Sequence, residues 1–111
     1  IKAKPKKIPL VQKRGNFYMK WHRYKEAIAD FDKVINDSAF DDDVFRLRGE
    51  AHLALKQFDP ALKDFNEAIE LSPELSENYG ARARAYRAMG KIDLARKDEA
   101  KAMEVKNQRI K

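Results

Sequence analysis

The 111-residue sequence contains no cysteine, and it has only four glycines, four prolines and one tryptophan. Without cysteine the chain cannot form a disulfide framework, a thiolate nucleophile, a cysteine-ligated zinc site or an iron–sulfur centre. No apolar run approaches the ~20 residues that a membrane-spanning helix needs, so no membrane span is expected. A cysteine-free chain suits the cytosol and the periplasm equally. The compartment therefore stays open to periplasmic and secreted locations, with the cytoplasm slightly favoured.

The net charge of +6 is concentrated at the ends of the chain. Residues 1–7 lack apolar periodicity, and we expect them to form a basic arm or linker. They contain four lysines, at Lys2, Lys4, Lys6 and Lys7. The remaining residues carry 20 basic and 18 acidic side chains, which is close to balance. Because the chain begins with isoleucine rather than methionine, we expect it to be a processed product or a piece of a longer protein.

The strongest pattern in the sequence is a repeat at a fixed period, over the equal blocks 8–41, 42–75 and 76–109. A period of about 34 residues is typical of stacked helical repeats. Three columns are identical in all blocks: Ala27, Ala61 and Ala95; Arg14, Arg48 and Arg82; Asp30, Asp64 and Asp98. Within each block, two amphipathic stretches flank a short turn, which predicts six helices near 8–21, 24–37, 42–55, 58–71, 76–89 and 92–107. We expect Asp59 to cap the fourth helix and Gly90 to end the fifth in a left-handed conformation.

These residues resemble the tetratricopeptide repeat family over about residues 8–107. The resemblance rests on the period, on a Gly or Ala column in the first helix of each block, on the Ala column of the second, and on Phe31, Phe65 and Pro73. Glu99 stands where Phe31 and Phe65 stand in the earlier blocks. The resemblance implies an all-α fold, a right-handed α-solenoid of three stacked antiparallel helix pairs, as a single domain over 8–109.

The Arg and Asp columns predict structural ion pairs. The two columns lie at mirrored positions on either side of the turn of each helical hairpin, which places their side chains opposite each other. We expect pairs within a repeat or with its neighbour, formed by Arg14 and Asp30, Arg48 and Asp64, and Arg82 and Asp98.

Catalytic and metal chemistry find little support in the sequence. The three serines, at positions 38, 72 and 76, fall in predicted turns, where helix capping explains them. His22 and His52 lie far apart in the sequence, in different blocks, and the acidic run of residues 41–43 lacks the spacing of a calcium loop. We therefore expect a non-enzymatic chain with no catalytic residue, no cofactor and no metal.

The functional prediction is a binding surface. In the repeat geometry the first helix of each pair lines a concave groove. The residues predicted to contact a partner there are Gln12, Lys13, Asn16, Met19, Lys20, Arg46, Leu47, Glu50, Leu53, Arg84 and Arg87. Their cationic and apolar mixture suits a peptide segment with acidic and apolar residues, and the chain is predicted to be a protein-interaction module.

Other partners fit the sequence less well. The family's carboxylate clamp for acidic chaperone C-termini falls on Gln12, Asn16, Leu47, Glu77 and Ala81, and only Asn16 matches, so a chaperone C-terminal tail is not expected. The acidic second block interrupts any basic stripe, so nucleic acid is not expected either. The alternative interpretation is a structural or oligomerisation segment of a larger protein, whose groove or basic ends mediate self-assembly as a homo-oligomer.

Overall fold

The computed structural model describes residues 8–37 and 43–110, and these residues form six helices and no strands. The helices are α1 (Leu10–Lys20), α2 (Tyr24–Asn36), α3 (Val44–Ala54), α4 (Phe58–Leu71), α5 (Ser76–Ala88) and α6 (Ile92–Ile110). The bounds agree closely with the predicted helices. The predicted arm, residues 1–7, and the junction of the first two blocks, 38–42, lie outside the described residues.

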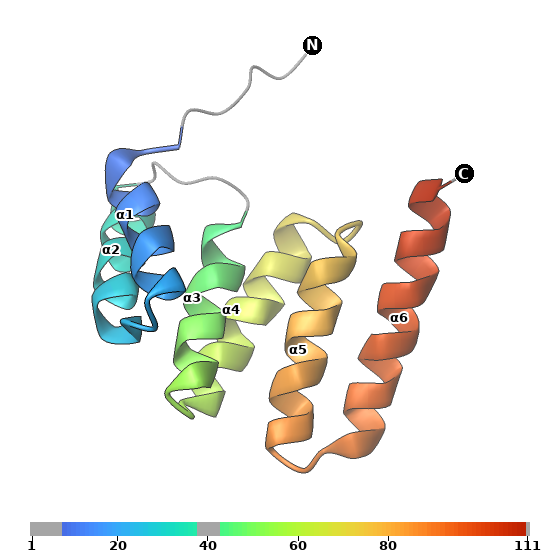
Figure 1. Ribbon diagram of the computed structural model, residues 1–111. Coiled ribbons are helices and arrows are strands. Elements are labelled where there is room, and N and C mark those ends of the chain that lie inside the picture. The colour runs from blue at the N-terminus through green and yellow to red at the C-terminus, as the bar shows by residue number, and fades with distance from the viewer. Residues whose placement is uncertain (1–7, 38–42, 111) are drawn as a thin grey trace.

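The helices form three antiparallel pairs that stack side by side, as the periodicity predicts (Figure 1). Between pairs, α2 packs on α3 and α4 packs on α5. The first helices also touch, α1 with α3 and α3 with α5, whereas the second helices do not touch one another within the described ranges. Because the first helices approach more closely, the stack curves toward them. The concave side of the solenoid is therefore formed by α1, α3 and α5.

Glycine allows an aromatic ring to lie against the first helix of the first two pairs. A Cβ atom added to Gly15 would lie 2.7 Å from Phe31 Cε1, and one added to Gly49 would lie 2.6 Å from Phe65 Cε1. Both rings are fully buried, and they are the largest of the fully buried side chains within the described residues. In the third block Glu99 replaces the aromatic residue, and the glycine column holds alanine instead. Because the third block has no such ring, its first helix does not require glycine at this position.

The turn inside each pair has one left-handed residue, at His22, Lys56 and Gly90, with φ of 60°, 60° and 79°. After the third of these, the Lys91 amide donates to the Tyr86 carbonyl at 2.8 Å, and the corresponding bonds close the other two turns. This pattern is the Schellman motif. The predicted left-handed end at Gly90 is thus confirmed.

The predicted cap at Asp59 is wrong. Helix α4 begins at Phe58, as predicted, but Gln57 occupies the cap position, two residues before Asp59, and makes no side-chain capping bond. The preceding turn ends at this residue, because the Gln57 amide donates to the His52 carbonyl at 2.8 Å. Asp59 instead lies in the first turn of the helix, where its charge interacts favourably with the helix dipole.

Candidate functional site

The concave side contains a hollow of about 310 Å³ at which all three first helices meet. Its wall combines apolar side chains with one acidic and one basic side chain. The lining residues are Met19 from α1, Glu50, Leu53 and Ala54 from α3, and Arg84 from α5, together with His22 from the first turn and Tyr24 at the start of α2. Three elements far apart in the sequence therefore build one small site.

Glu50 is the electrostatic centre of this hollow. Its Oε2 accepts hydrogen bonds from Arg84 Nη2 at 3.2 Å and from Arg46 Nη1 at 3.3 Å. Arg46 also forms an ion pair with Asp43 at 3.2 Å, and its side chain is only 17% exposed. The Arg84 side chain is 60% exposed. Arg84 can therefore turn to a ligand carboxylate, while Arg46 holds Glu50 in place.

The basic surface continues from the hollow along α1. An adjoining hollow of about 550 Å³ is lined by Lys13, Asn16, Phe17, Met19 and Lys20. Lys13 and Lys20 are exposed, and Met19 lines both hollows. The two hollows together place the exposed cations Lys13, Lys20 and Arg84 beside apolar side chains.

One residue predicted to contact a partner, Gln12, is fully buried. Because α1 packs against both α2 and α3, less of its surface is open than the groove prediction assumes. Leu47 and Leu53 are partly buried, and each packs against a core cluster while its edge stays accessible.

Arg87 is exposed, and it forms an ion pair with the neighbouring helix. Its Nε and Nη2 donate to the two carboxylate oxygens of Glu99 on α6, at 2.6 and 2.8 Å. These bonds lower the pKa of Glu99 below its ordinary value. In the first two blocks the same columns hold apolar pairs, which the next helix pair covers. Within the described part of the chain no pair follows α6, so an ion pair replaces the apolar contact.

The structure brings each predicted arginine and aspartate together. Arg14 donates to both oxygens of Asp30, Arg48 to those of Asp64, and Arg82 to those of Asp98, at distances of 2.7 to 2.9 Å. All three aspartates are buried. The pairs join the two helices of each hairpin.

Sequence reasoning missed a further bond that links neighbouring pairs. Arg48 Nη1 donates to Asp32 Oδ1 at 2.8 Å, and Arg82 Nη1 donates to Asn66 Oδ1 at 2.9 Å. Each of these acceptors lies 16 residues before its arginine, just as the buried aspartate lies 16 residues after it. This symmetric spacing, in a column that holds Asp32 and Asn66, could have predicted the two bonds from the sequence.

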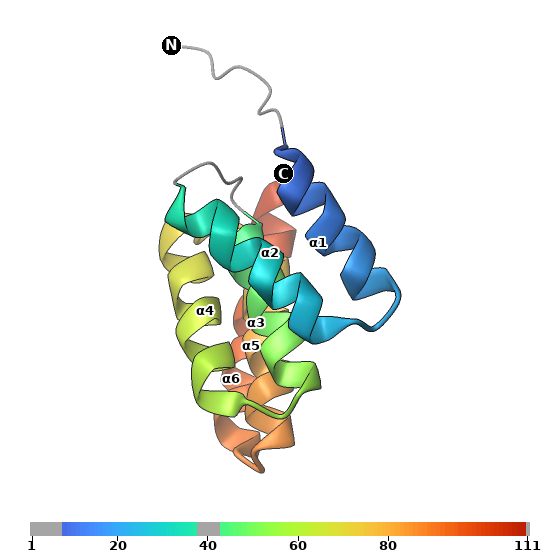
Figure 2. The same ribbon diagram turned by 90° about the vertical axis from the view of Figure 1, so that its left-hand side faces the viewer.

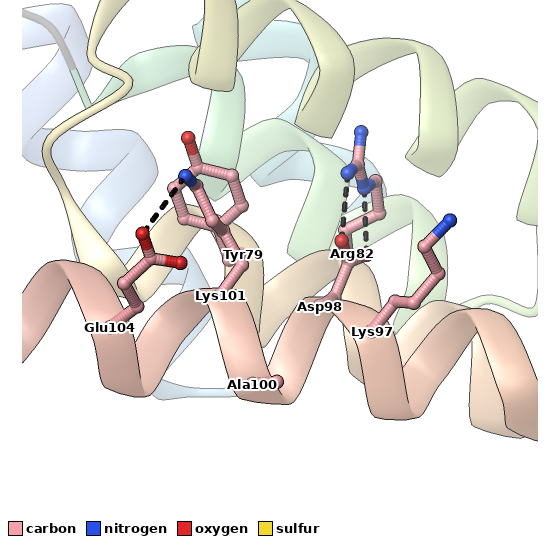
Figure 3. Close-up of a pocket in the computed structure, with 7 residues that line it drawn as sticks. All are labelled: Tyr79, Arg82, Lys97, Asp98, Ala100, Lys101 and Glu104. Carbon is pink, nitrogen blue, oxygen red and sulfur yellow. Dashed lines mark hydrogen bonds and ion pairs between the residues drawn. The ribbon is translucent and has the colours of Figure 1, made fainter.

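A hollow of about 440 Å³ between α5 and α6 is a weaker candidate (Figure 3). Arg82 is held there by Asp98, and Lys101 lies 3.8 Å from Glu104. The hydroxyl of Tyr79 donates to the Pro73 carbonyl at 2.8 Å. Most of the polar groups in this hollow are thus bonded within the chain, in contrast to the exposed cations of the concave side.

The described ranges contain no cluster of His, Cys, Asp or Glu side chains that could hold a metal ion. In the same ranges, no helix is long and apolar enough to cross a membrane. His52 Nδ1 lies 2.7 Å from Gln57 Oε1, so the group paired with this nitrogen is an amide and not a nucleophile.

Comparison with known proteins gives a consistent family assignment. Family models described as tetratricopeptide repeat match residues 8–36 and 43–75. Among solved structures, the first TPR of Spaghetti (RPAP3) bound to HSP90 peptide SRMEEVD is 29% identical with a TM-score of 0.81, and the alignment covers 86% of this chain and 76% of that one. MamA MSR-1 is 27% identical with a TM-score of 0.84, and the alignment covers 94% of this chain and 60% of that one. No curated protein sequence matches.

Proposed function

Since the chain belongs to the tetratricopeptide repeat family, we propose that it is a non-enzymatic module that binds a peptide segment of a partner protein on its concave side. The observation that carries the proposal is the hollow at which α1, α3 and α5 meet, with apolar and charged walls side by side. The neighbour bound to HSP90 peptide SRMEEVD shows that a solved relative of this fold takes a peptide.

The walls of the hollow define the chemistry of the ligand. Met19 and Leu53 offer an apolar contact for one side chain. Arg84 lies beside them and shares only one hydrogen bond with Glu50, so a ligand carboxylate can compete for it. Lys13 and Lys20 extend the positive charge along α1. The best ligand is a segment in which acidic residues flank an apolar anchor.

A chaperone C-terminal tail is not the proposed ligand. Two of the five clamp positions, Gln12 and Ala81, are fully buried, and a third, Glu77, is acidic. A tail such as SRMEEVD would meet only Asn16 as a suitable side chain. We expect the labelled peptide SRMEEVD to show no saturable binding, and saturable binding would overturn this exclusion while leaving peptide binding itself intact.

Fluorescence anisotropy with two labelled peptides tests the proposal. One peptide has glutamates around a central leucine, and the other has lysines in place of the glutamates. The acidic peptide is expected to bind at micromolar concentrations, and the basic one to bind at least tenfold more weakly. Arg84→Glu should weaken the acidic peptide at least tenfold, which corresponds to about 1.4 kcal/mol.

Lys63→Glu is the matched control, because it makes the same charge change at an exposed position of α4, outside the concave side. It should leave the affinity unchanged. Equal binding of both peptides, or equal loss in both variants, would show that net charge rather than this hollow governs the interaction. Thermal melts of both variants establish that the fold is retained.

A further inference from the structure

Helix α1 lies at one end of the stack (Figure 2). Its outer face exposes large apolar side chains. Leu10, Phe17 and Trp21 are 81%, 57% and 64% exposed. Their spacing of seven and four residues places them on one side of the helix. The rings of Phe17 and Trp21 lie 6.0 Å apart, and with Tyr18 and Arg23 they line a hollow of about 400 Å³. We call Leu10, Arg14, Phe17 and Trp21 the end face.

In the other two blocks the same columns are covered by a helix. Val44 and Asn78 occupy the column of Leu10, Ala51 and Ala85 occupy that of Phe17, and all four are fully buried. They are covered because α2 packs on α3 and α4 packs on α5. By the same geometry, the end face is the surface on which the second helix of a preceding pair would pack.

Arg14 shows what that helix must offer. The guanidinium groups of Arg48 and Arg82 each donate one bond to an oxygen of the covering helix, and these side chains are 22% and 23% exposed. Within the described residues Arg14 donates to Asp30 alone, and its side chain is 61% exposed. An occupant that supplies a carboxylate or amide oxygen at this point would complete the pattern.

Charge also selects the occupant. Helix α1 contains three basic side chains, Lys13, Arg14 and Lys20, and no acidic one. A second copy that presents its own α1 would place these cations near their equivalents, which is unfavourable. An acidic helix would instead be attracted to them.

A second copy stacked head to tail does not fit either. Its α6 carries Ala100 in the column of Asp32 and Asn66, so it offers no oxygen to Arg14. Phe17 is also larger than the alanines that the other blocks have in its column. A helix that packs on this face must therefore present a small residue to Phe17. The described face of α6 therefore does not match the end face.

We propose that the end face docks an acidic amphipathic helix of a partner protein. That helix presents Asp or Asn to Arg14, Ala or Gly to Phe17, and apolar side chains to Leu10 and Trp21. The site is separate from the hollow that contains Leu53 and Arg84, and it does not depend on the function proposed for that hollow. Because the face is small, the complex is weak, with a dissociation constant in the micromolar range or above.

Trp21 is the only tryptophan of the chain, so its emission reports directly on this face. The probe is a lactam-bridged helical peptide with Asp at the position facing Arg14, alanine facing Phe17, and glutamates on the flanks. Its titration should give a saturable blue shift of the Trp21 emission. A matched peptide with lysine in place of every acidic residue should bind at least tenfold more weakly.

Leu10→Ser tests the face without touching the core, because Leu10 is 81% exposed and lines neither of the two concave hollows. It should weaken the acidic helix at least tenfold, leave the thermal melt unchanged, and leave binding of the concave-side peptide unchanged. Three results would overturn the proposal: no shift with the acidic helix, equal shifts with both helices, or a blue shift that grows with protein concentration alone. The last result would identify a second copy as the occupant.

Discussion

Removing the guanidinium of Arg48 is expected to destabilise the protein more than removing any exposed charge. Arg48 donates two bonds to the buried Asp64 on α4 and one to Asp32 on α2, so it joins three helices of the stack. In Arg48→Met the apolar stem is retained, but the Asp64 carboxylate, whose side chain is 5% exposed, loses its cationic partner. The perturbation therefore leaves a buried charge without compensation.

The size of the effect follows from this burial. Breaking a fully buried ion pair by removing one partner costs roughly 3 to 5 kcal/mol. The side chain of Arg48 is 22% exposed, so some water reaches the site, and we reduce the expected loss to about 2 to 3 kcal/mol. For a domain of this size such a loss lowers the melting temperature by about 10 °C or more. The loss is also a large part of a total stability of ~5 to 15 kcal/mol.

A double-mutant cycle measured by urea unfolding separates the pair from its surroundings. Arg48→Met and Asp64→Asn are made singly and together, and the expected coupling energy is about 2 kcal/mol. The control is Arg23→Met, which breaks an exposed pair with Glu26 and should leave the unfolding midpoint unchanged. A coupling energy below about 0.5 kcal/mol, or equal losses in the two arginine variants, would refute the reasoning.

Four further substitutions test individual positions. Gly49→Ala should cost about 1 to 3 kcal/mol in chemical denaturation, because the new Cβ meets a buried ring at 2.6 Å, whereas Gly80→Ala should stabilise α5 by about 0.5 to 1 kcal/mol, because nothing lies within 4 Å. Lys56→Gly should raise the melting temperature, because the residue has a φ of 60° and a side chain is strained there; an unchanged or lower midpoint would contradict this. Glu99→Gln should reduce stability at neutral pH but not at low pH. The pKa of Glu99 is lowered in the folded state by Arg87, so its contribution is present above the unfolded pKa and is lost as the pH falls through the folded one; a difference that stays constant down to about pH 2 would exclude this cause.

Much of the fold could be predicted because the same residue types recur at the same positions in three successive blocks. The columns of Ala27 and Arg14 recur at the same place in every block, and a residue that recurs at a fixed period must meet the same environment each time. The capping residue of α4 was harder to predict than its bounds. Asp59 followed by Pro60 resembles a helix start, but Gln57, whose amide closes the preceding turn, occupies the cap position.

The concave side was predicted less completely, because the ends of a stack break its symmetry. Arg87 has the spacing of a groove residue, yet Glu99 on the neighbouring helix binds it. Gln12 has the same kind of spacing and is buried. Helical periodicity predicts on which face of its own helix a side chain lies, but it does not predict which neighbouring helix packs against that face.

The sequence by itself determined the helices, the number of stacked pairs and the pairing of Arg14 with Asp30, because each depends on residues close together along the chain or repeated at a fixed period. Only the tertiary structure decided which surfaces are open. The hollow around Glu50 exists because three helices from separate blocks converge, and Trp21 is exposed because no described helix precedes α1. The exposure of a side chain depends on all the elements that pack around it. The periodic sequence pattern of a helix is the same whether or not a neighbouring helix covers it.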